Sequence, residues 1–231
     1  MRILSLITAR GCSKRLPGKN LRILGGKPLI AWSIDAAKDI PEICDILVST
    51  DELDIAKASE SLGAYVPWLR PSELATDQAS SVDVALHALN WYEANKGSVD
   101  GILLLQPTSP FRTKETIRRG INLFSSSHYQ PILGVSSTQT HPMWMLKMNG
   151  DCLVPFLQDH GLEVRSQDLP PVYSVNGSFY LITPADLRLF HSFIGLKTVP
   201  LIIESVQESI DIDTELDFKL AEFYLANCDE S

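Results

Sequence analysis

Short apolar runs alternate with amphipathic stretches along most of the chain. The apolar runs predict buried strands at 2–8, 44–50, 101–105, 131–135, 178–183 and 198–203. The stretches between them show helical spacing and predict helices at 28–38, 52–62, 81–95 and 113–125, with a last helix from Thr214. Strands that alternate with helices in this way predict a three-layer α/β domain, with a parallel sheet covered on both faces.

Local signals mark the faces and the ends of these helices. The helix at 81–95 is expected to bury Val82, Ala85, Leu86 and Leu89. Candidate N-caps are Asp51, Thr113 and one of Ser80 and Ser81. Thr214 and Asp217 resemble a capping box, with Asp in place of the usual Glu or Gln.

The alternation breaks between about 137 and 175. This stretch contains His141-Pro142, Pro155 and Pro170-Pro171, together with Met and Trp residues at 143–148. Prolines interrupt regular elements, so the stretch predicts an inserted region of short strands and loops. Its apolar content makes it a candidate dimerisation arm.

Composition narrows the class of protein. The chain has 231 residues, of which 45 % are hydrophobic, and this suits one domain with an insertion. A formal net charge of −8 argues against general binding to nucleic acid or to an anionic membrane. No apolar run approaches the roughly 20 residues of a membrane span. The 4 cysteines show no metal or redox spacing, which favours a reduced, cytoplasmic protein.

Positive charge is nevertheless concentrated in the loop after the first predicted strand, ITARGCSKRLPGKN at 7–20. Its basic residues are Arg10, Lys14, Arg15 and Lys19. Loops at the carboxyl ends of parallel strands bind ligands in open α/β sheets, and Gly11 and Gly18 let a backbone approach a ligand closely. Backbone N–H groups and cations together favour a triphosphate. The spacing matches neither a Walker loop nor a dinucleotide fingerprint, and the alternative is a solvated basic loop.

An acidic pair lies near the other end of the chain, in SIDIDTE. In an extended segment Asp211 and Asp213 face one side, while Ile210 and Ile212 face the other. Adjacent carboxylates repel unless a cation lies between them, and Mg²⁺ binds carboxylates together with phosphate oxygens. The alternative is a pair of acids at a helix start, favoured by the helix dipole.

Several motifs in chain order carry a family resemblance. They are ARGCSKRLPGKN, VSTD at 48–51, LRPSELATDQASS at 69–81, LLQPTSPFR at 104–112, VNGSFY at 175–180 and SIDIDTELDF at 209–218. Together they resemble the CMP-sialic acid synthetases, the acylneuraminate cytidylyltransferase family. The resemblance implies a three-layer Rossmann-like nucleotidyltransferase fold, with a mainly parallel but mixed sheet. It also implies a single cytidylyltransferase domain over 1–231, with the insertion at about 137–175 serving the dimer and the sugar site.

The same resemblance assigns site residues. It implies nucleotide binding by Ala9, Arg10, Gly11, Ser13, Lys14, Lys19, Asn20, Arg70 and Ser81. It implies sugar binding by Gln106, Arg112, Asn176, Phe179 and Tyr180. It places Mg²⁺, or Mn²⁺, on Asp211 and Asp213, and makes Arg10, Lys14 and Asp211 catalytic. A core position for Phe179 and a surface ion pair for Arg112 stay open as alternatives.

The implied reaction joins CTP to a nine-carbon sugar acid in a homodimeric, CTP-dependent enzyme and releases pyrophosphate. The apolar run His141-Pro142-Met143-Trp144-Met145 resembles the legionaminic acid branch, because the sialic acid branch can carry a Lys close to this His-Pro pair. Pseudaminic acid, the eight-carbon acid Kdo and a non-catalytic nucleotide-binding protein remain alternatives. Asn20 argues against Kdo, for which Pro is common at this position. Cys12 stands where the family often has Gly, and no role follows for its thiol.

Overall fold

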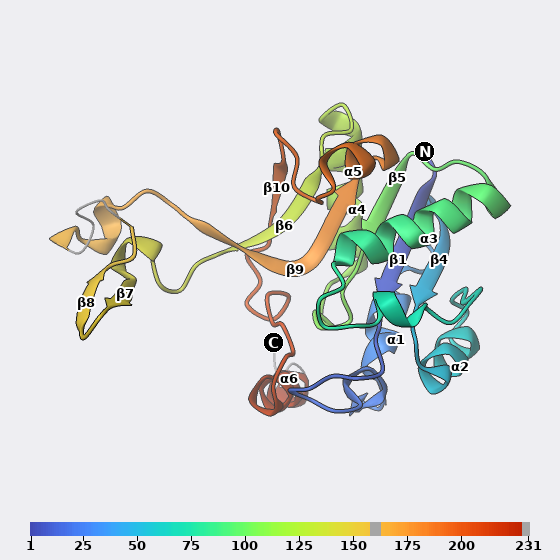
Figure 1. Ribbon diagram of the computed structural model, residues 1–231, viewed down its shortest axis with the longest axis horizontal. Coiled ribbons are helices and arrows are strands. Elements are labelled where there is room, and N and C mark those ends of the chain that lie inside the picture. Colours follow the sequence, from blue (N-terminus) through green and yellow to red (C-terminus); the bar gives the residue numbers. More distant parts are fainter. Residues whose placement is uncertain (158–162, 228–231) are drawn as a thin grey trace.

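The computed structural model describes residues 1–157 and 163–227, and a mixed sheet lies at its centre (Figure 1). The strands, in the order β10-β6-β9-β5-β1-β4, are Val199–Ile202, Ile132–Ser137, Tyr173–Ile182, Gly101–Leu104, Ile3–Thr8 and Ile43–Ser49. Strand β9 runs antiparallel to β5 and β6, whereas the other neighbouring strands are parallel. The predicted three-layer α/β fold with a mainly parallel, mixed sheet is therefore confirmed.

Helices cover both faces of this sheet. They are α1 (Leu29–Ala37), α2 (Leu53–Ser61), α3 (Ser81–Lys96), α4 (Lys114–Ser126) and α5 (Pro184–Phe190), whereas α6 (Glu215–Asn227) packs apart from these faces. Side chains of α1, α2 and α4 share one buried cluster with Ile3 and Ile7 of β1. Those of α3 and α5 share another with Leu4 and Leu6. Because successive side chains of β1 point to opposite faces of the sheet, this strand contributes to the core on both faces.

A third apolar cluster lies outside these layers and supports the loops at one edge of the sheet. It joins Leu16 of the basic loop, Phe111, Ile212 and Phe218 of α6. The final helix therefore packs beneath the basic loop. The chain also contains the short elements η1 (Lys19–Leu21) and η2 (Ser72–Leu74), and the paired strands β2 (Ile23–Leu24) and β3 (Lys27–Pro28).

Most of the expected helix caps are present. Ser80 Oγ accepts the backbone N–H three residues on at 3.0 Å, so Ser80 rather than Ser81 is the cap of α3. Thr113 Oγ1 accepts the corresponding N–H of α4 at 3.1 Å. At α6, Asp217 Oδ2 accepts from Thr214 N at 2.7 Å, and Asp217 N donates back to Thr214 Oγ1 at 3.3 Å. This reciprocal pair confirms the capping box.

Other sequence predictions were wrong. Asp51 does not cap α2: the N-cap position belongs to Glu52, and Asp51 Oδ1 accepts the N–H of Gly11 at 3.0 Å. The buried face of α3 includes Val84, Ala88 and Tyr92, whereas the expected Val82 and Leu86 are only half-buried. Helix α5 was not predicted, because a helix of 7 residues shows barely two turns of apolar spacing.

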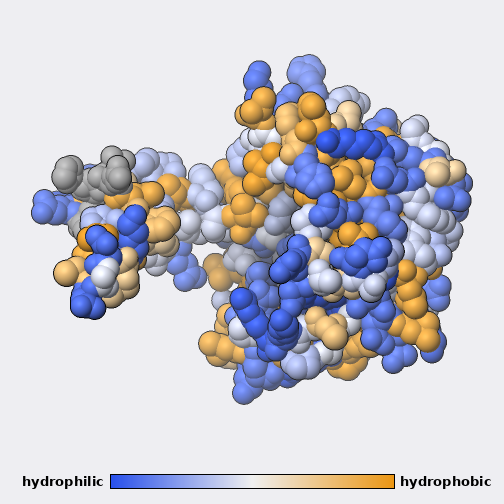
Figure 2. All heavy atoms as spheres, in the orientation of Figure 1, coloured by the Kyte–Doolittle hydropathy of each residue, from blue (hydrophilic) through white to orange (hydrophobic). Residues whose placement is uncertain are grey.

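The expected insertion leaves the sheet as a narrow arm (Figure 1). It contains η3 (Pro142–Trp144), the antiparallel strands β7 (Leu146–Asn149) and β8 (Cys152–Pro155), and η5 (Ser166–Asp168). Part of it, residues 158–162, lies outside the described residues. Strand β9 begins earlier than predicted because its first residues pair with the end of β6 and carry the chain back from the arm. Figure 2 shows apolar surface on the arm, where Met148 and Leu153 are exposed.

The stability of the α4 layer is expected to depend on a glycine. A Cβ built on Gly120 would lie 2.2 Å from Cζ of Phe179, whose ring is fully buried. We expect Gly120→Ala to lower the free energy of unfolding by about 2 kcal/mol, because overpacking outweighs the gain in helix propensity. Denaturant unfolding measures the change.

Two further variants control for this effect. Adding Phe179→Leu should recover part of the loss, because a smaller side chain makes room for the methyl group. Ser125→Ala on the exposed side of α4 should leave stability nearly unchanged. A fully stable Gly120→Ala protein would contradict the tight packing.

Candidate active site

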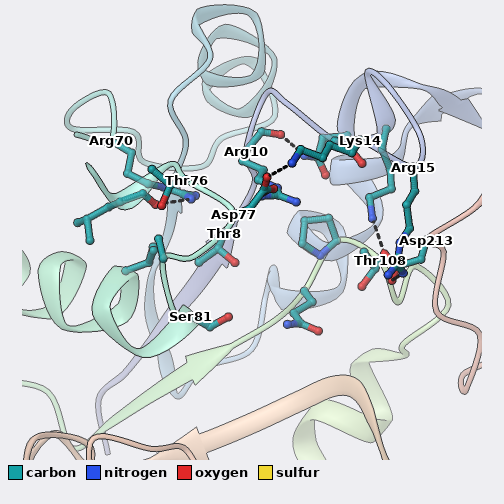
Figure 3. A pocket seen from close by; sticks show the side chains of 18 of the residues that line it. Thr8, Arg10, Lys14, Arg15, Arg70, Thr76, Asp77, Ser81, Thr108 and Asp213 are labelled. Atoms are coloured by element: carbon teal, nitrogen blue, oxygen red, sulfur yellow. Dashed lines mark hydrogen bonds and ion pairs between the residues drawn. The ribbon is translucent and has the colours of Figure 1, made fainter. Parts of the chain in front are cut away.

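A polar cleft of about 640 Å³ opens at the carboxyl ends of the parallel strands β1 and β5 (Figure 3). Its lining includes the predicted nucleotide residues Arg10, Ser13, Lys14, Lys19, Asn20, Arg70 and Ser81. It also includes Gln106, Asp211 and Asp213. The two charged features that lie almost two hundred residues apart in the sequence therefore border one cleft.

The first two cations of the basic loop contact one carboxylate. Arg10 Nη1 lies 2.6 Å from Asp77 Oδ1, and Lys14 Nζ lies 2.5 Å from Asp77 Oδ2 (Figure 3). Hydrogen bonds from Lys14 and Arg10 hold the pKa of Asp77 below its usual range. Asp77 belongs to the LRPSELATDQASS motif, but the sequence predicted no role for it.

The other two cations contact the acidic pair. Lys19 Nζ donates to the Ile212 carbonyl at 2.9 Å and to Asp213 Oδ1 at 3.0 Å, and its side chain is only 11 % exposed. Arg15 Nη1 lies 3.3 Å from Asp213 Oδ2, with most of its side chain in solvent. The basic loop and the acidic segment are therefore bound directly to one another.

Alternation along the acidic segment follows the expected pattern. Ile210 and Ile212 are buried in the apolar cluster beneath α6, whereas Asp211 and Asp213 face the cleft. The N–H of Ile212 donates to the carbonyl of Thr108 at 2.7 Å and fixes the segment against the loop after β5. Partial burial raises the pKa of Asp211, and the negative charge of Asp213 adds to this effect.

Two buried polar residues shape the nucleotide side of the cleft. Arg70 Nε donates to Ser49 Oγ at 3.0 Å, and Arg70 Nη2 donates to the Ser49 carbonyl. Burial lowers the pKa of Arg70. Asn20 Nδ2 donates to the carbonyl of Arg10 at 2.9 Å and so ties the two ends of the basic loop together. Both side chains therefore fix neighbouring backbone segments and also line the cleft.

Two of the expected nucleotide residues, Ala9 and Gly11, are not among the residues that line the cleft. The N–H of Ala9 donates to the Ser49 carbonyl at 3.0 Å, and that of Gly11 donates to Asp51. A Cβ on Gly11 would lie 2.9 Å from Cβ of Glu52, so this glycine makes room for the protein itself. Neither N–H is directed at a ligand in this arrangement.

The expected sugar residues divide into two groups. Gln106 lines the cleft. Tyr180 is partly buried, and this burial, together with the negative charge of Asp211, raises the pKa of its hydroxyl. Asn176 donates to Ser136 Oγ at 2.9 Å and also accepts hydrogen bonds within its own strand. The buried ring of Phe179 packs on α4, which agrees with the core alternative for that residue.

Arg112 lies in the interior of the protein and not at its surface. It is 3 % exposed, with Nε donating to the Ser178 carbonyl at 2.6 Å. Its other donors reach Ser33 Oγ at 3.0 Å and the Gln106 carbonyl at 2.7 Å. Burial lowers the pKa of Arg112 to about 9. The guanidinium thus joins α1, β9 and the loop after β5, and a surface ion pair is ruled out.

Gly177 adjoins the cleft residue Gln106, and the sequence predicted no role for it. Its φ is +74°, and a Cβ there would lie 2.7 Å from Oε1 of Gln106. Only glycine adopts this conformation readily and also leaves room for the carboxamide. The signal available in the sequence was a glycine inside a strand.

Two further findings concern a metal-binding cluster and a membrane-spanning helix. Across 1–157 and 163–227, no group of three or more His, Cys, Asp and Glu side chains is arranged to hold a metal ion. A metal at Asp211 and Asp213 would therefore need further ligands from a substrate or from water. Among the same residues, no helix has the length and apolar character needed to span a membrane.

The cleft lies at the carboxyl ends of the strands, which is where open α/β sheets generally bind their ligands. The sequence pattern of the cytidylyltransferase family matches residues 4–181. Because this match covers most of the 231 residues, the chain belongs to the cytidylyltransferase family.

Relatives with known names extend this assignment. The chain is 42 % identical to the CMP-N,N'-diacetyllegionaminic acid synthase of Legionella pneumophila, over 96 % of the chain and 95 % of that protein. It is 32 % identical to the N-acylneuraminate cytidylyltransferase of Escherichia coli, over 95 % of the chain but 51 % of that protein. It therefore spans about half the length of the E. coli relative. The pseudaminic acid cytidylyltransferase of Campylobacter jejuni is 28 % identical over 96 % of the chain and 95 % of that protein.

Solved structures agree on the fold. A CMP-2-keto-3-deoxy-manno-octonic acid synthetase complexed with CTP gives a TM-score of 0.71 at 16 % identity, covering 98 % of this chain and 99 % of the other. A 4-diphosphocytidyl-2C-methyl-D-erythritol synthase from Anaerococcus prevotii gives 0.65 at 17 % identity, covering 98 % and 96 %. At such low identity the likeness concerns the fold alone.

The buried position of Arg112 leads to a prediction about stability. We expect Arg112→Gln to lower the free energy of unfolding by about 3 kcal/mol, because it leaves buried carbonyl groups without their charged donor. Arg118→Gln on the exposed side of α4 is the matched control and should be nearly neutral. Chemical denaturation of both variants measures the difference. A stable Arg112→Gln protein with a weakened affinity for sugar acid would instead support direct substrate contact.

Proposed function

We propose that this protein transfers CMP from CTP to a nine-carbon sialic-type sugar acid and releases pyrophosphate. The observation that carries the proposal is the meeting of the basic loop and the Asp211–Asp213 pair in one cleft of a cytidylyltransferase. Cations suit a triphosphate and carboxylates suit a divalent ion, so the two halves of the cleft have complementary chemistry.

The basic loop is proposed to hold the triphosphate. Arg10 and Lys14 border the cleft with exposed nitrogen donors, and they would neutralise charge that develops on the departing pyrophosphate. Lys19 and Arg15 lie on the side of Asp213 and would assist. Asn20, Arg70, Ser13 and Ser81 would surround the nucleotide from the cleft wall.

The acidic pair is proposed to bind Mg²⁺ or Mn²⁺. Both carboxylates face the cleft, and the raised pKa of Asp211 reflects burial and repulsion that a cation would relieve. Oxygen donors of this kind suit either ion, and a bound ion would supply charge neutralisation between phosphate oxygens. Asp211 and Asp213 would hold it, while Lys19 keeps Asp213 oriented.

The chemical step needs positioning more than covalent help. The anomeric C2 hydroxyl of the sugar acid would attack the α-phosphorus of CTP. The bond from that phosphorus to the bridging oxygen breaks, the proton of the hydroxyl passes to solvent water, and pyrophosphate leaves in line. Gln106, which lies in the loop after β5 and beside Gly177, would orient the sugar.

Among sugar acids, N,N'-diacetyllegionaminic acid is the favoured substrate. The named relative for that acid is 42 % identical to this chain, against 32 % for the N-acylneuraminate enzyme of E. coli and 28 % for the pseudaminic acid enzyme. The apolar stretch after His141 supports the same choice. N-acylneuraminate and pseudaminic acid are the next candidates. The likeness to the eight-carbon enzyme is confined to the fold.

A homodimer is proposed from the arm. Met148 and Leu153 lie opposite each other across β7 and β8 and are 65 % and 62 % exposed. Exposed apolar side chains on a projecting hairpin favour burial against a second copy. The arm would thereby bring residues of the insertion toward the sugar site of the partner.

The proposed substrate can be tested with a pyrophosphate-release panel. CTP and a divalent metal are supplied with each acid in turn: legionaminic, N-acylneuraminic, pseudaminic and Kdo. We expect the highest kcat/KM with diacetyllegionaminic acid and the lowest with Kdo. Binding of CTP without turnover on any acid would favour a non-catalytic nucleotide-binding protein.

Removing one carboxylate separates activity from stability. We expect Asp211→Asn to lower turnover at least about a hundredfold, because an amide cannot supply the charge a metal needs. Since burial raises the pKa of Asp211 in the folded chain, its ionised form costs folding free energy above that pKa. The neutral variant should therefore unfold at the same temperature as the parent, or higher, at neutral pH. Turnover and thermal unfolding are measured together.

Asp217→Asn is the matched control. Asp217 belongs to the same segment but accepts N–H groups of Asp213 and Thr214 at the start of α6. We expect this variant to keep its turnover and to lose some stability. Normal turnover in Asp211→Asn would refute the metal role.

A further inference from the structure

Asp77 occupies the place expected for a ligand. Its two oxygens contact different cations, with Oδ1 at 2.6 Å from Arg10 and Oδ2 at 2.5 Å from Lys14 (Figure 3). These are the cations proposed to hold the triphosphate. A carboxylate that spans both groups is a small anion supplied by the protein itself, and a phosphate group needs the same donors.

The segment that carries Asp77 is fixed at both ends and exposed between them. At one end the N–H of Arg70 donates to the Thr50 carbonyl at 2.6 Å, and the Arg70 side chain is buried. At the other end Ser80 caps α3. Residues 76–78 are exposed. A movement of this exposed tip away from the cations would leave Arg70 and α3 in place.

The contacts made by Asp77 are of a kind that a polyphosphate can displace. The side chains of Asp77, Arg10 and Lys14 are 44 %, 39 % and 79 % exposed. Ion pairs this open to solvent are weak, and a ligand with several negative charges attracts the same cations more strongly. Hydrogen bonds from Lys14 and Arg10 lower the pKa of Asp77, so the carboxylate stays charged at neutral pH.

We propose that Asp77 is an internal competitor of polyphosphate ligands. It holds Arg10 and Lys14 when no nucleotide is bound, the triphosphate of CTP displaces it, and it returns to the same cations as pyrophosphate leaves. The proposal rests on the proposed function of the basic loop. No bond is made or broken at Asp77. Its effect is to keep the affinity for pyrophosphate low, so that the product is released.

Equilibrium binding to the full chain tests this competition without any sugar acid. We expect Asp77→Asn to bind pyrophosphate about three- to tenfold more tightly than the parent, the size expected when two exposed ion pairs no longer compete. CTP should also bind more tightly, whereas cytidine, which has no phosphate, should bind unchanged. In turnover assays, inhibition by added pyrophosphate should strengthen by a similar factor.

Glu73→Gln is the matched control. It removes the same charge from the same segment, but Glu73 is exposed and its side chain contacts Ser72 Oγ at 3.5 Å. Its affinity for pyrophosphate should stay within about twofold of the parent, since a distant exposed charge is screened. A change equal to that of Asp77→Asn would show that the effect comes from net charge alone, and this would overturn the proposal.

The remaining outcomes are also decisive. Unchanged or weaker pyrophosphate binding in both Asp77→Asn and Asp77→Ala would overturn the competition and make Asp77 a positioning residue or a bystander. Absence of pyrophosphate binding to the parent protein and to both Asp77 variants would overturn it as well. If the parent binds CTP and pyrophosphate but turns over no acid, the proposed function fails alone. If it turns over and the Asp77 variants bind no tighter, the competition fails alone.

Discussion

The buried ammonium of Lys19 is the contact on which the cleft depends. It donates to the Ile212 carbonyl and to Asp213, and little of its side chain reaches solvent. Burying a charge without partners is costly, so Lys19 can stay buried only while the acidic segment supplies its hydrogen-bond acceptors. Because the N–H of Ile212 also holds the Thr108 carbonyl, the loop after β5 is fixed in the same place. Three loops from distant parts of the chain thus share one anchor.

Apolar burial beneath this anchor supplies the remaining support. Leu16, Ile212 and Phe218 bring the basic loop, the acidic segment and α6 into one cluster. Hydrophobic burial is non-directional and sets only proximity, whereas the hydrogen bonds of Lys19 set orientation. Charged groups therefore line the cleft, apolar groups pack beneath it, and α6 supports it through this packing.

Each of the four cations of the basic loop contacts a carboxylate of the protein. Arg10 and Lys14 contact Asp77, and Arg15 and Lys19 contact Asp213. Exposed cations at such close range repel one another unless anions lie between them. The two carboxylates differ in what a ligand would do to them. A triphosphate would replace Asp77, whereas a metal would join Asp213.

The sequence by itself determined most helices and strands, the family motifs and the two faces of the acidic segment, because these depend on local periodicity and on residues a few positions apart. It did not determine that β9 lies antiparallel between β5 and β6, since an apolar run reads alike in either direction. The sequence also did not predict that Arg112 is buried or that Asp77 contacts the basic loop. Arg112 binds a carbonyl 66 residues away, and Arg10 meets Asp77 across 67 residues. Only the packed tertiary structure decides which groups meet across such distances, because burial and charge pairing select partners in space and not along the chain.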